Sequence, residues 1–401
     1  MRPPHGDRDF ARAVAAIERG ESEQAETACR DILAANPDHF DAHHLSGLIR
    51  AERGDYATAL EHFERAATLR PNDAQVQSNR GLALRRLGRE DDALSVLDDA
   101  LRIEPGHAIA RLNRGMILLA RGQAKAALAD FDAALAREPA FAAALDQRGL
   151  ALMALTRFQE ALHSFEKAIA ADSRVAATHY NRATALENLG RHEDALAACD
   201  AALALDRSHL DTQRLRGHLL RDMNLHAQAR AALDLALEAK PGSAALRLER
   251  VMAELALLYL DESEMEERRR AYADQLAILA ADAKAEDFSR DLGAEVGSAQ
   301  PFFLPYQGRN DRDLQSAYGN IICAAALRRF GAATLAPPPR PGEKLRVGIV
   351  SGFFRMHSNW KMRIRSWLER IDRSRFEVFG YYTGEGASEV TAQAAQQCQR
   401  F

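Results

Sequence analysis

Alanine recurs at intervals of 34 residues through most of the chain, seven times in succession, at Ala25, Ala59, Ala93, Ala127, Ala161, Ala195 and Ala229. A period of this length indicates a stack of small helix–turn–helix units, none of which can bury its apolar face alone. The sequence therefore predicts a mainly α-helical solenoid of seven repeats and fourteen helices over residues 6–243.

Other positions of the repeat follow the same period, counting each unit from Gly6, Phe40, Ala74, Ala108, Ala142, Ala176 and Leu210. The eighth position is always glycine or alanine, and the twenty-seventh is alanine in six of the seven repeats. Small side chains let helix axes approach to roughly 8–10 Å. A larger apolar residue at the twenty-fourth position is expected to fill the layer between repeats, at Phe63, Leu97, Phe131, Phe165 and Leu233.

The spacing and the small positions resemble the tetratricopeptide repeat, which implies a right-handed superhelix with a concave surface for partners. Residues 244–335 continue as capping helices and a transition region, with a helix expected from Asp311 to Phe330. A proline-rich linker follows at residues 336–344. Residues 345–401 then read as β-α-β-α, the start of a parallel, Rossmann-like α/β unit.

Bulk properties exclude several classes of function. The net charge of −4 argues against a general nucleic-acid binder. No apolar run is long enough to cross a membrane, and the N-terminus lacks a signal-peptide pattern, so we expect a cytoplasmic protein without membrane contacts. The four cysteines are far apart, and small buried apolar residues are favoured over disulfides or a metal site. No metal-binding, phosphate-loop or dinucleotide motif predicts a cofactor.

Carboxamides occupy the sixth position of four successive repeats, at Asn79, Asn113, Gln147 and Asn181. Each offers a hydrogen-bond donor and an acceptor. If the first helix of each repeat lines the concave groove, these amides can pair with the backbone of an extended peptide or protein partner. In the alternative interpretation, they merely bond neighbouring helices.

Arginine occupies the seventh position of five successive repeats, and an acid occupies the twenty-fifth. We expect each arginine to face the acid of its own repeat, as Arg114 would face Asp132. This arrangement would give a repeated ion pair between the two helices of a repeat. The alternative is a ladder of arginines that binds phosphate groups.

A turn after the first predicted strand leads to His357, at the end of a strand where open α/β sheets bind ligands. The histidine there fits a base or a hydrogen-bond donor to an anion. A capping or surface histidine is the alternative.

Together, the repeats, the linker and the stretch LRVGIVSGFFRMH resemble the bacterial relatives of O-linked N-acetylglucosamine transferase. Val347, Gly348, Val350, Ser351, Phe354 and His357 match the first catalytic strand of that family, whereas Phe353 stands where aspartate is usual. The resemblance implies a two-lobed GT-B fold, a uridine diphosphate sugar as donor substrate and His357 as the active-site histidine. It also places the groove asparagines of the family on Asn79, Asn113 and Asn181, with Gln147 as a near match.

Two hypotheses follow. In the first, the chain is the N-terminal, peptide-binding part of a protein O-glycosyltransferase and is catalytically incomplete by itself, because the second lobe is absent. In the second, it is a non-catalytic repeat scaffold. Since two parallel strands cannot close a core, we expect the edges of these strands to be exposed.

Overall fold

The computed structural model describes residues 5–256, 258–298, 300–301, 303–332, 343–351, 364–382 and 389–401. The chain divides into two compact units, Met1–Gly331 and Ala332–Phe401. The first unit is entirely helical in its described part, and the second contains two strands and two helices.

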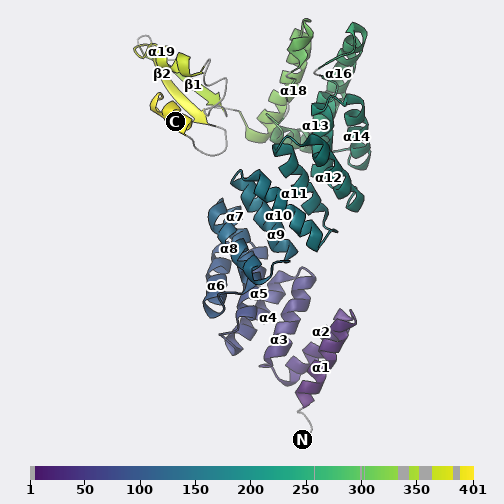
Figure 1. Ribbon diagram of the computed structural model, residues 1–401, viewed down its shortest axis with the longest axis vertical. Helices are drawn as coiled ribbons and strands as arrows, with labels where there is room; N and C mark the ends of the chain where they lie inside the picture. Colours follow the sequence, from purple (N-terminus) through teal and green to yellow (C-terminus); the bar gives the residue numbers. More distant parts are fainter. Residues whose placement is uncertain are drawn as a thin grey trace. The chain divides into compact units, whose positions relative to one another are not determined.

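The predicted fourteen repeat helices are present (Figure 1). The first helices of the seven repeats are α1 His5–Glu18, α3 Phe40–Glu52, α5 Ala74–Arg86, α7 Ala108–Ala120, α9 Ala142–Ala154, α11 Ala176–Asn188 and α13 Leu210–Asp222. The second helices are α2 Ser22–Ala35, α4 Tyr56–Leu69, α6 Glu90–Ile103, α8 Ala124–Arg137, α10 Phe158–Ala171, α12 His192–Leu205 and α14 His226–Ala239. The prediction of a mainly helical repeat superhelix is therefore confirmed.

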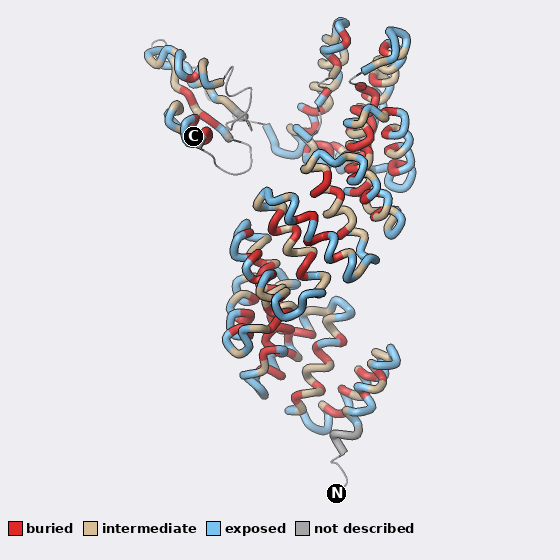
Figure 2. The backbone as a smooth tube through the Cα atoms, in the orientation of Figure 1, coloured by how far each residue is buried: buried red, intermediate tan, exposed pale blue. Residues whose placement is uncertain are grey.

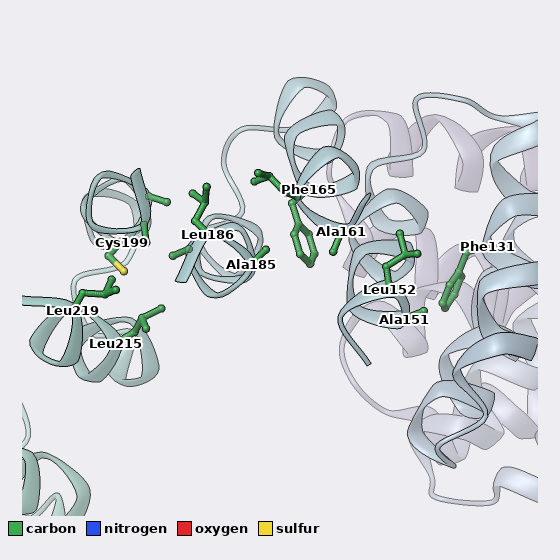
Figure 3. Close-up of a cluster of buried hydrophobic side chains, with 14 of the residues drawn as sticks. Phe131, Ala151, Leu152, Ala161, Phe165, Ala185, Leu186, Cys199, Leu215 and Leu219 are labelled. Carbon is green, nitrogen blue, oxygen red and sulfur yellow. The ribbon is translucent and has the colours of Figure 1, made fainter. Parts of the chain in front are cut away.

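Small residues at the predicted positions bring the helices together. All seven alanines at the twentieth position are completely buried, and so is the side chain at position 24 in most repeats. Figure 2 shows the resulting stripes of buried residues along the helices. Figure 3 shows Phe131, Phe165 and Cys199, from three successive repeats, within one continuous apolar cluster.

The side chains at positions 8 and 24 of a repeat are complementary in size. A Cβ atom added to Gly115 would lie 2.5 Å from the ring of Phe131, and one added to Gly149 would overlap the ring of Phe165. Where alanine replaces this glycine, at Ala13 and Ala183, position 24 holds cysteine instead. Cys29 and Cys199 are thus buried, as predicted, and they occupy the space of a larger side chain, whereas Cys323 is exposed.

A left-handed residue at position 15 forms the turn between the two helices of every repeat. Five of these residues are glycines, with φ between 71° and 79°. The other two are Thr156, with φ 57°, and Asn224, with φ 59°. Left-handed backbone costs an L-residue about 1–2 kcal/mol, and a β-branched side chain is the least suited to it.

Replacing Thr156 with glycine should therefore stabilise the repeat unit by about 0.5–1 kcal/mol, after the entropy that glycine loses on folding. Urea unfolding followed by circular dichroism measures the change. Asn224→Gly is the matched control, and it should stabilise less because asparagine tolerates this conformation. Unchanged or reduced stability of Thr156→Gly would contradict the inference that the left-handed backbone at Thr156 is strained.

A different kind of packing caps the C-terminal end of the array. Helices α15 Ala244–Met252, α16 Glu262–Asp282, α17 Glu286–Ala294 and α18 Arg312–Phe330, with the short 3₁₀ helix η1 Leu304–Gln307, surround a separate apolar core. Glu254, which is 2% exposed, accepts hydrogen bonds from Arg250 at 2.5 Å and Arg268 at 2.9 Å. The Nε atom of Arg230 lies 3.8 Å from the same carboxylate. This buried ionic cluster joins the last repeat to its cap.

The second unit contains β1 Leu345–Ser351, α19 Arg365–Arg370, β2 Phe376–Tyr382 and α20 Glu389–Gln396. The strands pair in parallel, with Leu345 opposite Phe376, as the predicted β-α-β-α order requires. Leu368, Val378, Val390 and Ala394 form its small core. That this unit is the beginning of a Rossmann-like lobe stays a prediction, because two strands do not distinguish that fold.

The expectation that both strands lack further partners was wrong for β2. The backbone N–H of Gln399 donates to Val378 at 2.8 Å, and that of Gly380 donates to Arg400 at 2.8 Å. Phe379 and Arg400 thereby form a parallel bridge. The residues after α20 return to β2 because its backbone groups still need hydrogen-bond partners.

Candidate peptide-binding face

The first helices of successive repeats contact one another as well as their own second helices: α3 with α5, α5 with α7, α7 with α9, α9 with α11 and α11 with α13. Second helices make no comparable contacts with each other within the described repeats. In a curved stack, the elements on the inner side lie closer together. We therefore call the surface formed by positions 2, 5, 6 and 9 of repeats 2 to 7, on these first helices, the inner face.

Apolar side chains run along the inner face at the ninth position of repeats 2 to 5. Leu48 is 41% exposed, and Leu82, Met116 and Leu150 are half-buried. The same position holds Thr184 and then His218 in the next two repeats. The ninth-position column thus changes from apolar to polar along the array. On each helix, the residue at the ninth position lies one turn away from the residue at the fifth position.

The predicted amides lie in the sixth-position column of this face, but their exposure differs. Asn79 and Asn113 are only 6% and 4% exposed, whereas Gln147 and Asn181 are half-buried. Sequence reasoning treated the four as equivalent. The two in repeats 5 and 6 are more accessible to a ligand.

A hydrogen bond links two of the amides to the preceding repeat. Asn79 donates to Nε2 of His44 at 2.9 Å, and Asn181 donates to Oδ1 of Asp146 at 3.0 Å. In both cases the acceptor is the fifth residue of the previous repeat. Where that position is Ser78, the next amide, Asn113, bonds the carbonyl of Ile109 in its own helix instead. The alternative role of the amides, bonding between neighbouring helices, is therefore present at two of the four positions.

Sequence reasoning missed the fifth-position residues as partners of the amides. Burial lowers the pKa of His44, which keeps the ring neutral and its Nε2 able to accept from Asn79. Burial also raises the pKa of Asp146, against hydrogen bonds from Asn181, Thr178 and Gln147 that act in the opposite direction. The separation of 35 residues between each acceptor and its amide is the signal in the sequence that could have revealed the link.

The predicted ion pairs exist, but between repeats rather than within them. Arg114 contacts Asp98 at 2.6 Å, Arg148 contacts Asp132 at 2.6 Å, and Arg216 contacts Asp200 at 2.7 Å. The pairing within one repeat was wrong because position 25 faces the first helix of the following repeat. These arginines are occupied by acids, which disfavours the phosphate-binding ladder.

The same arginine column also reaches its own second helix. Arg114 makes two hydrogen bonds to Asp130, at 2.8 and 2.6 Å, and Arg111 donates to the same carboxylate at 2.8 Å. Asp130 is 2% exposed. The hydrogen bonds that Arg114 donates to Asp130 and Asp98 raise the pKa of Arg114 against the opposing effect of burial.

Charged side chains gather on the first helices at the C-terminal end of the array. Nδ1 of His218 lies 3.0 Å from Glu187 and its Nε2 lies 3.3 Å from Asp222. The hydrogen bond to Glu187 raises the pKa of His218, so the imidazolium is favoured. Arg221 bonds Glu249 at 3.0 Å beside it. The first helices at this end of the array thus carry paired charges.

Other functional predictions find no test in the described part of the chain. His357 and Phe353 lie outside the described residues. Within the described ranges, no group of three or more His, Cys, Asp or Glu side chains is arranged to hold a metal ion. None of the helices in those ranges has the length and apolar character needed to cross a bilayer.

Comparison with known families decides the nature of the array. One family model, described as tetratricopeptide repeat, matches residues 10–74 and 147–209, and a second with the same description matches residues 50–112. The array consists of tetratricopeptide repeats. Neither family model reaches the second unit. No curated protein sequence matches the chain.

Solved structures show similarity to part of the chain. One chain of the Cut9–Hcn1 hetero-tetramer of the APC/C is 17% identical with a TM-score of 0.53, over 60% of this chain and 48% of that one. PilW, a type IV pilus biogenesis factor, is 22% identical with a TM-score of 0.48, over 53% and 98%. YrrB, a protein described as having an unusual peptide-binding site, is 22% identical with a TM-score of 0.41, over 47% and 96%.

Proposed function

We propose that the tetratricopeptide array is a protein-interaction scaffold whose inner face binds an extended segment of a partner protein. The observation that carries the proposal is the placement of half-buried apolar and amide side chains side by side on the first helices α7, α9 and α11. Met116 and Leu150 offer apolar surface, and Gln147 and Asn181 offer hydrogen bonds. An extended segment needs both, since its backbone seeks donors and acceptors while its side chains seek apolar surface.

The amides retain hydrogen-bonding capacity for this role. A carboxamide has two N–H donors and an acceptor oxygen. Asn181 donates one N–H to Asp146, and Asn113 donates one to the carbonyl of Ile109. We assign the main backbone contacts to Gln147 and Asn181, with Asn113 and the more buried Asn79 extending the same column.

Replacing Asn113, Gln147 and Asn181 together with alanine should weaken binding of a peptide selected on the wild-type chain by about 10-fold or more, since each lost hydrogen bond contributes roughly 0.5–1.5 kcal/mol. Calorimetric titration measures the affinity. Helicity, followed by circular dichroism, should change little.

The matched control is the double variant Gln159→Ala and Gln228→Ala, which removes exposed amides from the second helices α10 and α14. It should bind like the wild type. Equal affinities of the triple variant and the wild type would contradict the assigned role of the amides. A failure to select any peptide would contradict the proposed function itself.

A second proposal concerns the second unit, Ala332–Phe401. We propose that the second unit is the start of a glycosyltransferase-like lobe, with His357 beside the acceptor hydroxyl and a uridine diphosphate sugar as donor. The stretch from Val347 to His357 and the parallel pairing of β1 with β2 support it. Because we expect the chain to be catalytically incomplete by itself, incubation with a radiolabelled uridine diphosphate sugar and protein acceptors should give no transfer. Turnover that is lost in His357→Ala would contradict that incompleteness and would assign a catalytic role to His357.

A further inference from the structure

One charged side chain interrupts the neutral central part of the inner face. Among the second, fifth, sixth and ninth positions of repeats 4 to 6, only Asp146 carries a charge. On its own helix Leu150 is the neighbour one turn away. Leu112 and Tyr180 hold the same fifth position in the preceding and following repeats, and all three of these side chains are half-buried.

The hydrogen-bond partners of Asp146 are neutral. Its Oδ1 accepts from Asn181 at 3.0 Å and its Oδ2 from Gln147 at 3.5 Å, while Thr178 supplies a third hydrogen bond. No ion pair to Asp146 occurs among the described residues. By contrast, Asp98, Asp130 and Asp132 on the second helices are each bound by arginine.

Arginines on the helix of Asp146 and on the first helix of the preceding repeat are held by other side chains. Arg114 of α7 is held by Asp98 and Asp130, and Arg148 of α9 is held by Asp132 and Ser164. The side chains of both arginines extend toward the second helices and not toward the inner face. A half-buried carboxylate whose hydrogen-bond partners are all neutral, beside apolar side chains, favours an approaching cation.

We propose that Asp146 selects a basic side chain, arginine or lysine, in the extended segment that the inner face binds. The proposal rests on the proposed function and specifies its ligand. The cationic head bonds the carboxylate, and the aliphatic stem lies along Leu150, as basic side chains do when they cover apolar surface. The favoured ligand is therefore an extended peptide with one basic residue among apolar residues.

The test begins with a display library of random 12-residue peptides, selected on the full chain. Enrichment of arginine or lysine at one position among the binders is expected. The best binder is then synthesised with arginine, and again with its neutral isostere citrulline, and fluorescence anisotropy gives both affinities. The arginine peptide should bind wild type about 10-fold tighter, as one charge-assisted hydrogen bond predicts.

Variants then assign this preference to one carboxylate. In Asp146→Asn, which keeps the shape and can still accept from Asn181, the ratio between the two peptides should fall to about one. In Asp146→Glu, which keeps the charge, a preference should remain. Asp132→Asn, which removes a carboxylate from α8, should leave the ratio unchanged. Thermal unfolding confirms that each variant is folded.

The outcomes separate the two claims. Binders without a basic preference, or a preference that persists in Asp146→Asn, would overturn the role of Asp146 and leave the peptide-binding scaffold intact. A library that yields no binders would instead overturn the proposed function.

Discussion

Alanine in place of Glu254 is expected to lower the free energy of unfolding at the C-terminal end of the array by about 3–5 kcal/mol, the range for breaking a buried ion pair from one side. The substitution removes the carboxylate that Arg250 and Arg268 share and that Arg230 approaches. Burial already lowers the pKa of Arg230 in the presence of this acid. Without the carboxylate of Glu254, the three guanidinium groups would lie close together with no acid between them.

Hydrogen exchange locates this loss better than a global melt, because each repeat contacts only its neighbours. Amides of α14, α15 and α16 should lose protection, while those of α5 to α8 should keep it. Glu262→Ala is the control, since Glu262 pairs with Arg309 at the surface and its side chain is 84% exposed. Its exchange should match the wild type. Unchanged protection of α15 and α16 in Glu254→Ala would show that the ionic cluster does not hold the cap.

Alanine in place of Phe165 should destabilise the centre of the array by about 3–5 kcal/mol, because the ring is fully buried and its removal leaves a cavity. The backbone of α9 cannot close that cavity easily. Gly149 opposite the ring has no side chain that could move into it.

Cys199→Ala is the matched control, at the same position of the next repeat. This variant should lose about 1 kcal/mol of its free energy of unfolding, because only a single sulfur atom is removed and the Cβ of Ala183 already fills part of the space at position 8. Urea unfolding of both variants measures the difference. Similar losses in the two variants would contradict the complementarity of positions 8 and 24.

The strictly periodic residues made most of the fold predictable. A buried alanine every 34 residues set the helix register, and all seven are buried as expected. The left-handed turn residues were equally readable, since glycine recurs with the same period at Gly20, Gly54, Gly88, Gly122 and Gly190. The size relation between position 8 and position 24 was also present in the sequence.

Partners across a repeat boundary were harder to predict. Arg114 and Asp132 belong to one repeat, yet Arg114 bonds Asp98 of the previous repeat, because the direction of a side chain from its helix decides its partner. The link from Asn181 to Asp146 has the same origin. The cluster around Glu254 lies beyond the last regular repeat, where periodicity no longer aligns its residues.

Hydrogen exchange of the full chain with and without a selected peptide tests the central claim most directly. We predict added protection in the first helices α7, α9 and α11, which carry the amide and apolar columns of the inner face, and little change in the second helices α8, α10 and α12. Protection confined to the second helices, or to residues 343–401, would contradict the account of the inner face as the peptide-binding surface.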